Sequence, residues 1–182
     1  MATGKRLSAR CVGKKGTRWW GIIRISHEID YLRWIFGEVE WVRATLSQQS
    51  KLEIDVEDSA NLTMGFLPNS GGRQLIGTLN LDLIRHDHTR SCTAIGERGT
   101  LRWNGLTGEV GLYEEDATRW KMLYRHQPKQ DETYRFELQS FLDSIEENGI
   151  PLVTAKDGLR VLEIIEAAQV SSTTGAQEMT YK

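Results

Sequence analysis

His27 has the clearest potential for chemistry in this chain, because it falls in the first turn of a predicted helix. Unpaired backbone amides and the helix dipole make a helix start electropositive, which disfavours an imidazolium there. A neutral ring could accept a proton or polarise a substrate oxygen. Asp30 follows on nearly the same helical face and could hold the ring or complement the helix start. The alternative is that His27 is structural or merely exposed.

Two other sets of residues are candidates for binding a ligand. His86 and His88 flank Asp87 at a predicted strand end, a spacing that could bind a metal, but no third ligand is evident and a solvated loop is the alternative. We therefore predict no metal site. A dinucleotide needs a glycine-rich loop between a strand and a helix. The central glycines instead follow strand-like residues with nothing helical after them, at positions 96, 99, 105, 108 and 111.

The spacing of apolar residues predicts the helices and strands that carry these candidate residues. Apolar residues at 29, 32, 35 and 36 predict a helix that Ser26 caps and Gly37 ends. A β-branched and aromatic strand is predicted over 39–46. Between residues 60 and 124 the apolar period is two, clearest in the alternating leucines 75–83, and short turns separate the runs. This pattern predicts an antiparallel meander of about six strands with one buried face.

Two helices are predicted to close the chain. The first has an apolar stripe made of Tyr134, Leu138, Phe141, Leu142 and Ile145. The second begins at Thr154, with Asp157 in its first turn, and presents a broad apolar surface over residues 159–168. The order of elements predicts an α+β fold in which helices cover one face of a large, open, mainly antiparallel sheet.

Composition excludes several classes of partner. The chain has 182 residues, 23 basic and 25 acidic, with a formal charge of -2, which gives no electrostatic footprint for nucleic acid or an anionic bilayer. No run of residues is long and apolar enough for a membrane span. Cys11 and Cys92 are too isolated for a disulfide framework, so we expect a reduced, buried Cys92 and a cytoplasmic protein.

Four stretches of sequence together resemble one family. These are residues 26–39, SHEIDYLRWIFGEV, residues 54–58, IDVED, residues 95–101, IGERGTL, and residues 157–168, DGLRVLEIIEAA. In this order, they resemble the C-terminal half of the Gfo/Idh/MocA oxidoreductases, the family of glucose-fructose oxidoreductase and inositol dehydrogenase. The resemblance spans residues 21–182.

The resemblance implies a substrate-binding and oligomerisation domain whose full-length relatives bind NAD or NADP in a separate Rossmann domain. Those relatives exchange a hydride with sugar-like alcohols and ketones. His27 matches the family's substrate-side histidine, and Asp30 and Arg24 are our candidate substrate contacts. Because no Rossmann domain is recognised here, we expect no cofactor to be bound by this chain alone, and no activity without a separate Rossmann chain.

Residues 1–20 depart from the family pattern. The family usually carries Glu-Leu-Gly-Gly-Gly upstream of the histidine, where this chain has GTRWWG over residues 16–21. The codon for tryptophan read one base out of frame yields glycine, so we expect residues 1–20 to be an out-of-frame or disordered leader. Ile23 and Arg24 also stand where family members usually place an aspartate. A second hypothesis is a non-enzymatic module that self-associates through a polar sheet face bearing Gln74, Thr78, Asn80 and Asp82.

Overall fold

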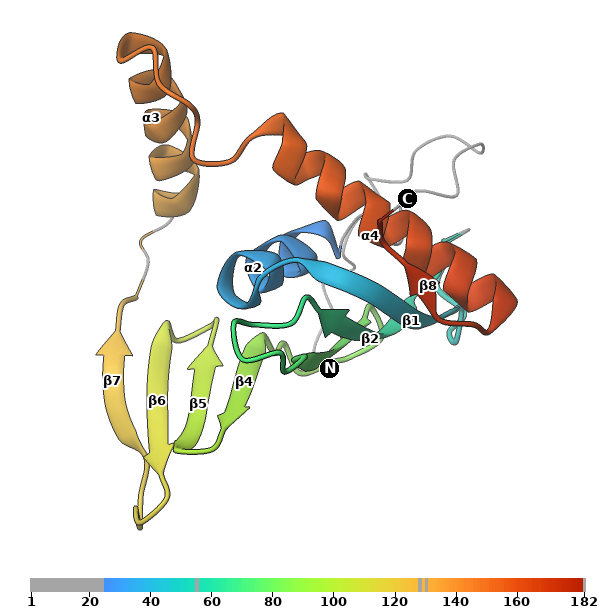
Figure 1. Cartoon of the computed structure of the whole chain (residues 1–182), viewed down its shortest axis with the longest axis horizontal. Helices are drawn as coiled ribbons and strands as arrows, with labels where there is room; N and C mark the ends of the chain where they lie inside the picture. Colours follow the sequence, from blue (N-terminus) through green and yellow to red (C-terminus); the bar gives the residue numbers. More distant parts are fainter. Residues whose placement is uncertain (1–24, 55, 128, 130, 182) are drawn as a thin grey trace, which may run out of the picture. The chain divides into compact units, whose positions relative to one another are not determined.

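The computed structural model describes residues 25–54, 56–127, 129 and 131–181. The chain divides into two compact units, unit 1 comprising Met1–Ile84 and Val153–Lys182 and unit 2 comprising Arg85–Leu152 (Figure 1). Each unit contains one four-stranded antiparallel sheet. The predicted α+β class with mainly antiparallel strands is therefore confirmed, and the described residues form no Rossmann domain.

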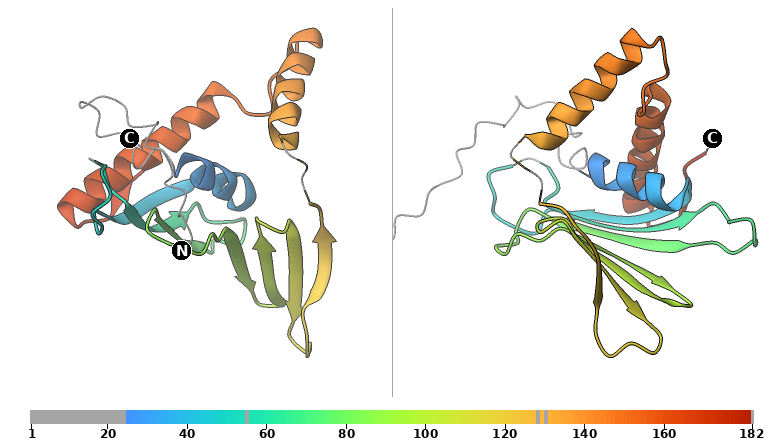
Figure 2. Two further views of the ribbon diagram at one scale, coloured as in Figure 1. Left: turned by 180° about the vertical axis from the view of Figure 1, so that it is seen from behind. Right: turned by 90° about the vertical axis from the view of Figure 1, so that its left-hand side faces the viewer.

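Unit 1 is a sheet with helices packed on one face. Sheet A has the strand order β3-β2-β1-β8, formed by β3 (Ile76–Asp82), β2 (Ser59–Phe66), β1 (Val39–Ser47) and β8 (Glu178–Met179). Helices α2 (Ser26–Phe36) and α4 (Ala155–Thr174) lie on the same side of this sheet (Figure 2). None of the helices in the described ranges is long and apolar enough to cross a membrane.

The core of unit 1 follows the predicted period of two. The even residues of β2 are buried, and in β3 the residues opposite them are half-buried while their neighbours are exposed. From the helices, the core receives Ile29, Leu32, Val161, Ile164, Ile165 and Ala168. Leu159 and Leu162 of the predicted apolar surface remain substantially exposed, so α4 buries a narrower stripe than its composition suggested.

Helix α2 differs from its prediction at its start and on its buried face. It begins with Ser26, and Ile25 occupies the capping position without a side-chain hydrogen bond, so Ser26 is not the cap. Gly37 ends the helix as predicted, with a φ of 95° that favours glycine. Ile35, expected on the buried face, is half exposed.

Unit 2 contains sheet B and one helix. Sheet B follows chain order through β4 (Ser91–Gly96), β5 (Gly99–Asn104), β6 (Glu109–Glu114) and β7 (Lys121–Arg125), and helix α3 spans Glu132–Glu146. No described residue of unit 2 is buried. The expected dry face at residues 120–124 is thus wrong for β7, whose residues are all exposed, and Cys92 is half-buried instead of buried.

The six strands predicted between residues 60 and 124 are all present, but they do not form one meander. β2 and β3 pair with β1 in sheet A, whereas β4–β7 form sheet B. The polar segment between β3 and β4 carries the ion pair of Arg85 with Asp87, at 2.8 Å, instead of strand residues. Turn signals in the sequence mark where strands end and do not specify which sheet each strand joins.

One edge of β1 is completed by helix α4. β8 pairs only with Trp41 and Val42, which leaves the rest of that edge without a strand. The Ala44 amide instead donates to Ser171 Oγ at 3.0 Å, and the Leu46 amide donates to Ser172 Oγ at 2.9 Å. Ser171 is fully buried and also donates to the Ala176 carbonyl. Two serine hydroxyls thus satisfy amides that a longer β8 would otherwise pair.

Replacing Ser171 measures how much its hydrogen bond to the edge of β1 contributes to the free energy of unfolding. Ser171→Ala leaves the buried Ala44 amide without an acceptor, so we expect the free energy of unfolding to fall by about 1–3 kcal/mol. Urea denaturation followed by circular dichroism measures it. Ser172→Ala is the matched control and should cost less, because Ser172 is only partly buried and water can reach the Leu46 amide. Equal losses in the two variants would contradict this interpretation.

Candidate functional site

His27 lies in the first turn of α2 with its side chain exposed. The preceding carbonyl of Ile25 accepts from the amides of Glu28 and Ile29, both at 3.0 Å, so the helix is fully formed from this turn onward. Within the described part of the chain, the His27 ring makes no hydrogen bond and no ion pair. The ring is therefore free to exchange a proton with a molecule that reaches it from solvent.

Asp30 is directed toward Arg33 in the structure. Its Oδ1 lies 3.6 Å from Arg33 Nη1, one turn further along α2, and no interaction in the described residues joins it to His27. The Asp30 carboxylate is partly exposed, which leaves it accessible to a ligand. Arg24, the other predicted substrate contact, lies outside the described residues, as do residues 1–20.

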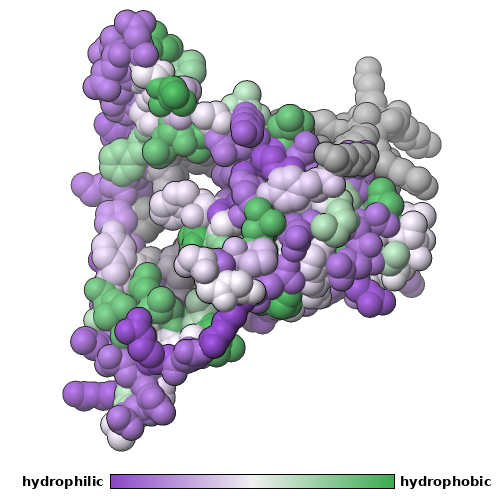
Figure 3. All heavy atoms as spheres, in the orientation of Figure 1, coloured by the Kyte–Doolittle hydropathy of each residue, from purple (hydrophilic) through white to green (hydrophobic). Residues whose placement is uncertain are grey.

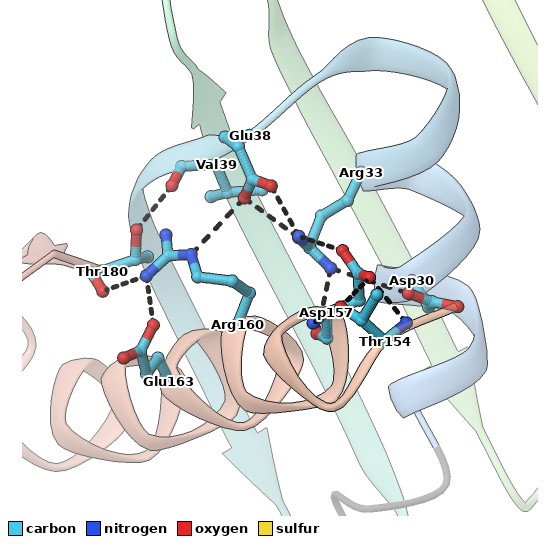
Figure 4. Close-up of polar contacts among 9 residues, drawn as sticks. All are labelled: Asp30, Arg33, Glu38, Val39, Thr154, Asp157, Arg160, Glu163 and Thr180. Carbon is cyan, nitrogen blue, oxygen red and sulfur yellow. Dashed lines mark hydrogen bonds and ion pairs between the residues drawn. The ribbon is translucent and has the colours of Figure 1, made fainter. Parts of the chain in front are cut away.

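The most extensive polar cluster of unit 1 surrounds Arg33 and Glu38 (Figure 4). Arg33 donates to Glu38 through Nε at 3.0 Å and through Nη2 at 2.5 Å, a bidentate pair, and its Nη1 donates to the Asp157 carbonyl at 3.1 Å. The Arg33 side chain is only 5% exposed. Since α2, the start of β1 and the first turn of α4 all contribute, this cluster fixes the three elements together.

Asp157 links the cluster to the start of α4. Its carboxylate accepts from the Thr154 amide at 2.8 Å and from the Thr154 hydroxyl at 2.6 Å, while the Thr154 hydroxyl accepts from the Asp157 amide. These bonds form a reciprocal capping box between the two residues that the sequence analysis placed at the start of this helix. The same carboxylate lies 3.7 Å from Arg33 Nη2.

Hydrogen bonding sets the protonation of these groups. The bond from Arg33 holds the pKa of Glu38 below its ordinary value, against the opposing effect of desolvation. The hydroxyl and amide of Thr154 lower the pKa of Asp157 in the same way. Glu38 in turn raises the pKa of Arg33. All three groups are therefore charged at neutral pH.

Arg160 of α4 approaches Glu38 from the other side. Its Nε lies 3.5 Å from Glu38 Oε2, its Nη1 contacts Glu163 and the Thr180 carbonyl, and its guanidinium stacks 3.8 Å from the Tyr181 ring. The Arg160 side chain is only 11% exposed, and its buried Nε and Nη2 atoms have no hydrogen-bond partner among the described residues. The residues after β8 thus cover the cluster, and Thr180 Oγ1 donates to the Val39 carbonyl at 2.5 Å.

This cluster holds the helix that carries His27, but it places no reactive group beside the His27 ring. The buried guanidinium groups of Arg33 and Arg160 both contact the partly exposed Glu38 carboxylate, so these charges serve to hold α2 in place. His27 stands on the exposed start of the helix that they hold. Sequence reasoning missed this cluster, although a charged residue next to Leu32 on the buried face of the helix was a signal for it.

Gly108 does not belong to a phosphate-binding turn. Gly108, with a φ of 66°, lies in the turn between antiparallel strands, and an added Cβ would meet the His126 carbonyl oxygen at 1.7 Å. The conformation therefore serves a close backbone contact, and no helix start follows it to receive a pyrophosphate.

The two histidines of the loop before β4 do not form a metal site. His86 and His88 are exposed, and Asp87 between them is bound to Arg85. In the part of the chain that the structure describes, no three His, Cys, Asp or Glu residues are grouped to hold a metal ion.

The Glu38 carboxylate should make stability depend on pH. Glu38→Gln leaves the buried Arg33 charge unpaired, and we expect a loss of about 1–2 kcal/mol at pH 7, less than for a fully buried pair because Glu38 is partly exposed. A lowered pKa stabilises the fold above about pH 4.3 and loses this effect as the pH falls through the folded value. The difference between wild type and Glu38→Gln should therefore shrink in acid.

Urea denaturation between pH 7 and pH 3 tests this prediction, with Glu53→Gln on an exposed loop as the control. A constant difference between wild type and Glu38→Gln across that range would count against an ionised Glu38 in the folded state.

Comparison with solved structures relates this fold to dehydrogenases. Levoglucosan dehydrogenase, solved with NADH, superimposes with a TM-score of 0.73 at 20% identity, over 86% of this chain and 49% of the other. The WlbA dehydrogenase from Bordetella pertussis, solved with NADH and UDP-GlcNAcA, gives 0.63 at 22% identity, over 86% and 44%. An Agrobacterium radiobacter oxidoreductase, solved with NAD+, L-tartaric acid and magnesium, gives 0.67 at 17% identity, over 85% and 47%.

The chain thus spans about half the length of these relatives. No curated protein matches it. A family model described as the oxidoreductase family, C-terminal alpha/beta domain, matches residues 22–180, which include both helices and all strands of unit 1 as well as the whole of unit 2. The chain therefore belongs to the Gfo/Idh/MocA oxidoreductase family, whose C-terminal domain it contains.

Proposed function

We propose that this chain supplies the substrate-binding and assembly half of an NAD(P)-dependent oxidoreductase that acts on a sugar, a cyclitol or a related alcohol or ketone. The observation that carries the proposal is the exposed imidazole of His27 at the start of a helix that a buried ionic cluster holds in place. The family match over residues 22–180 supports a substrate-side role for this histidine, as the resemblance implies.

The ligands named with the similar structures support this class of substrate. Levoglucosan dehydrogenase was solved with levoglucosan and with L-sorbose, and the Bordetella pertussis enzyme with a sugar nucleotide. All of these ligands present several hydroxyl groups. An exposed imidazole and a carboxylate on the same helix suit such a ligand, because one group can accept a hydroxyl proton and the other can accept a hydrogen bond.

His27 would exchange a proton with the oxygen at the reacting carbon of the substrate. Asp30, one turn further on, would accept a hydrogen bond from a neighbouring hydroxyl while keeping its contact with Arg33. Arg24 stays a candidate for a further substrate contact. The buried cluster contributes by holding α2, so that both side chains project from a fixed helix.

NAD or NADP would be bound by a nucleotide-binding half, in the same protein or in a separate Rossmann chain. That cofactor supplies or accepts the hydride when it is bound. Since the described residues offer it no cradle, the 182 residues alone should be inactive. A cytoplasmic location remains a prediction from composition and cysteine content.

A second candidate function is self-association through the outward face of sheet A without catalysis. Polar residues of β2 and β3 stand opposite one another on this face, including Thr63 with Thr78 and Asn61 with Asn80. Asn80 Nδ2 donates to Asn61 Oδ1 at 2.6 Å. Such a face suits a wet, moderately polar interface.

Titration with nucleotides tests whether this chain binds NAD or NADP by itself. Because the described residues fit no dinucleotide, isothermal titration of the purified chain with NAD and with NADP should give no saturable heat at concentrations up to about 1 mM. Micromolar binding of either nucleotide would overturn the proposal that a separate nucleotide-binding half holds the cofactor.

Titration with a polyol tests the site itself. Levoglucosan or myo-inositol at millimolar concentration should shift the ring resonances of His27 in the NMR spectrum, and the spectrum of His27→Gln, which lacks these resonances, identifies them. His88→Gln, an exposed histidine of unit 2, is the matched control and should leave the shift unchanged. Shifts that fall equally on His86 and His88, or none at His27, would argue for the non-catalytic alternative.

A further inference from the structure

Residues 178–181, which we call the covering segment, lie over the charged cluster of unit 1. Thr180 is buried and donates through Oγ1 to the Val39 carbonyl at 2.5 Å and through its amide to the Glu40 carbonyl at 2.9 Å (Figure 4). Within the segment, β8 pairs with two residues of β1. The segment is therefore fastened to the start of β1 by a few backbone contacts.

The outer side of the covering segment faces water. Tyr181 is 41% exposed, and Met179 is also exposed. On the surface of unit 1 that Figure 3 shows, hydrophobic residues are scattered among hydrophilic ones. Movement of the segment away from β1 would therefore admit water to the charged groups beneath it.

Arg160 of α4 lies directly beneath the covering segment. Its guanidinium stacks on the Tyr181 ring, with Cζ 3.8 Å from the ring centroid, and its Nη1 donates to the Thr180 carbonyl at 3.3 Å. A guanidinium over an aromatic face is attracted by the ring, and more strongly where water is excluded. Tyr181 is therefore the side chain that keeps Arg160 covered.

Two donors of Arg160 are unsatisfied while the segment covers it. Its Nε and Nη2 are buried and have no hydrogen-bond partner among the described residues. A buried donor without an acceptor is unfavourable, because water would otherwise bind it. The contacts with Tyr181 and Thr180 thus offset a cost that water would remove if the segment moved away. Loss of the Tyr181 ring should therefore favour an Arg160 side chain that turns toward solvent.

Arg160 connects the covering segment to the helix that carries His27. Its Nε lies 3.5 Å from Glu38 Oε2, and the same oxygen accepts from Arg33 Nε of α2 at 3.0 Å. The other oxygen of Glu38 accepts from Arg33 Nη2. With Arg160 in place, the Glu38 carboxylate is held from two sides. Without it, the carboxylate is held by Arg33 alone and can move together with that side chain.

We propose that Tyr181 is a positioning residue for the site on α2, which it serves by keeping Arg160 against Glu38. While the covering segment lies on β1, the two arginines fix Glu38, and α2 presents His27 and Asp30 in one direction. When the segment moves away, Arg160 becomes hydrated and the hold on α2 weakens. The effect on a substrate rests on the proposed function, whereas the chain of contacts from Tyr181 to Arg33 does not.

Amide hydrogen exchange measures how often the covering segment moves away. The Thr180 amide exchanges when its bond to the Glu40 carbonyl opens. Tyr181→Ala should raise the exchange rate at least about fivefold, and Tyr181→Phe, which keeps the ring, should stay within about twofold of the wild type. Tyr134→Ala, at an exposed position of α3, is the matched control and should leave the rate unchanged.

NMR resonances on α2 report whether the effect reaches the site. Tyr181→Ala should shift the Arg33 Nε–H resonance and the His27 ring resonances, and Tyr181→Phe should return both to their wild-type positions. Arg160→Gln should produce the same shifts, and Tyr181→Ala should add little to them in the Arg160→Gln background, because the two residues act in series. Tyr181→Leu keeps apolar bulk without the aromatic ring and gives the same test if Tyr181→Ala does not fold.

Polyol binding extends the test to the proposed function. The affinity for myo-inositol, measured from the His27 ring shifts, should fall at least about threefold in Tyr181→Ala and be restored in Tyr181→Phe. A wild-type chain that binds no polyol would refute the proposed function alone, because the exchange and resonance measurements are made without ligand.

Three results would overturn the positioning role. The first is an unchanged Thr180 exchange rate in Tyr181→Ala, which would mean that the ring does not hold the segment. The second is faster exchange with unchanged resonances of Arg33 and His27, which would make the segment a cover with no effect on α2. The third is additive shifts in Tyr181→Ala and Arg160→Gln, which would mean that Tyr181 does not act through Arg160.

Discussion

The structure of unit 1 depends on the bidentate contact between Arg33 and Glu38. Burying a guanidinium is costly unless its donors are satisfied, and the carboxylate of Glu38 satisfies two of them at 3.0 and 2.5 Å. Glu38 stands just before β1, Arg33 belongs to α2, and Arg33 also reaches the Asp157 carbonyl at the start of α4. Two consecutive elements and a helix from near the end of the chain therefore meet at one ion pair.

The two units differ in how they exclude water. Unit 1 combines an apolar core with groups that complete its edges, since Ser171 and Ser172 take the place of strand partners for β1 and Thr180 closes over Val39. Unit 2 satisfies its backbone through hairpins but buries no described side chain. Hydrogen bonding alone contributes little net stability to a sheet exposed on both faces, so unit 2 needs an external layer and unit 1 does not.

Local signals in the sequence predicted local features of the fold. The period of two placed Ala60, Leu62, Met64 and Phe66 on the buried face of β2. Thr154 was predicted at the start of the last helix, with Asp157 in its first turn, where the structure has a capping box. The division into two sheets was not predictable in the same way, because strand pairing depends on which partner each edge meets in space. The Arg33 cluster was missed for a related reason. Its members are separated by up to 124 residues, and spacing along one helix cannot reveal a carboxylate on the next strand or a carbonyl on the last helix.

An ion pair at this position fixes the register of α2 on the sheet, which apolar packing alone would not do. Leucine and isoleucine tolerate small shifts of a helix along a sheet, whereas a guanidinium fork meets a carboxylate in one geometry. A slip of one residue would turn each side chain of α2 by 100° and move it 1.5 Å along the axis. His27 and Asp30 would then both turn away from their present direction, and Arg33 would lose both of its bonds to Glu38. The buried cluster therefore determines which residue stands at the exposed start of α2, and this constraint acts over more than one helical turn without any contact with His27 itself.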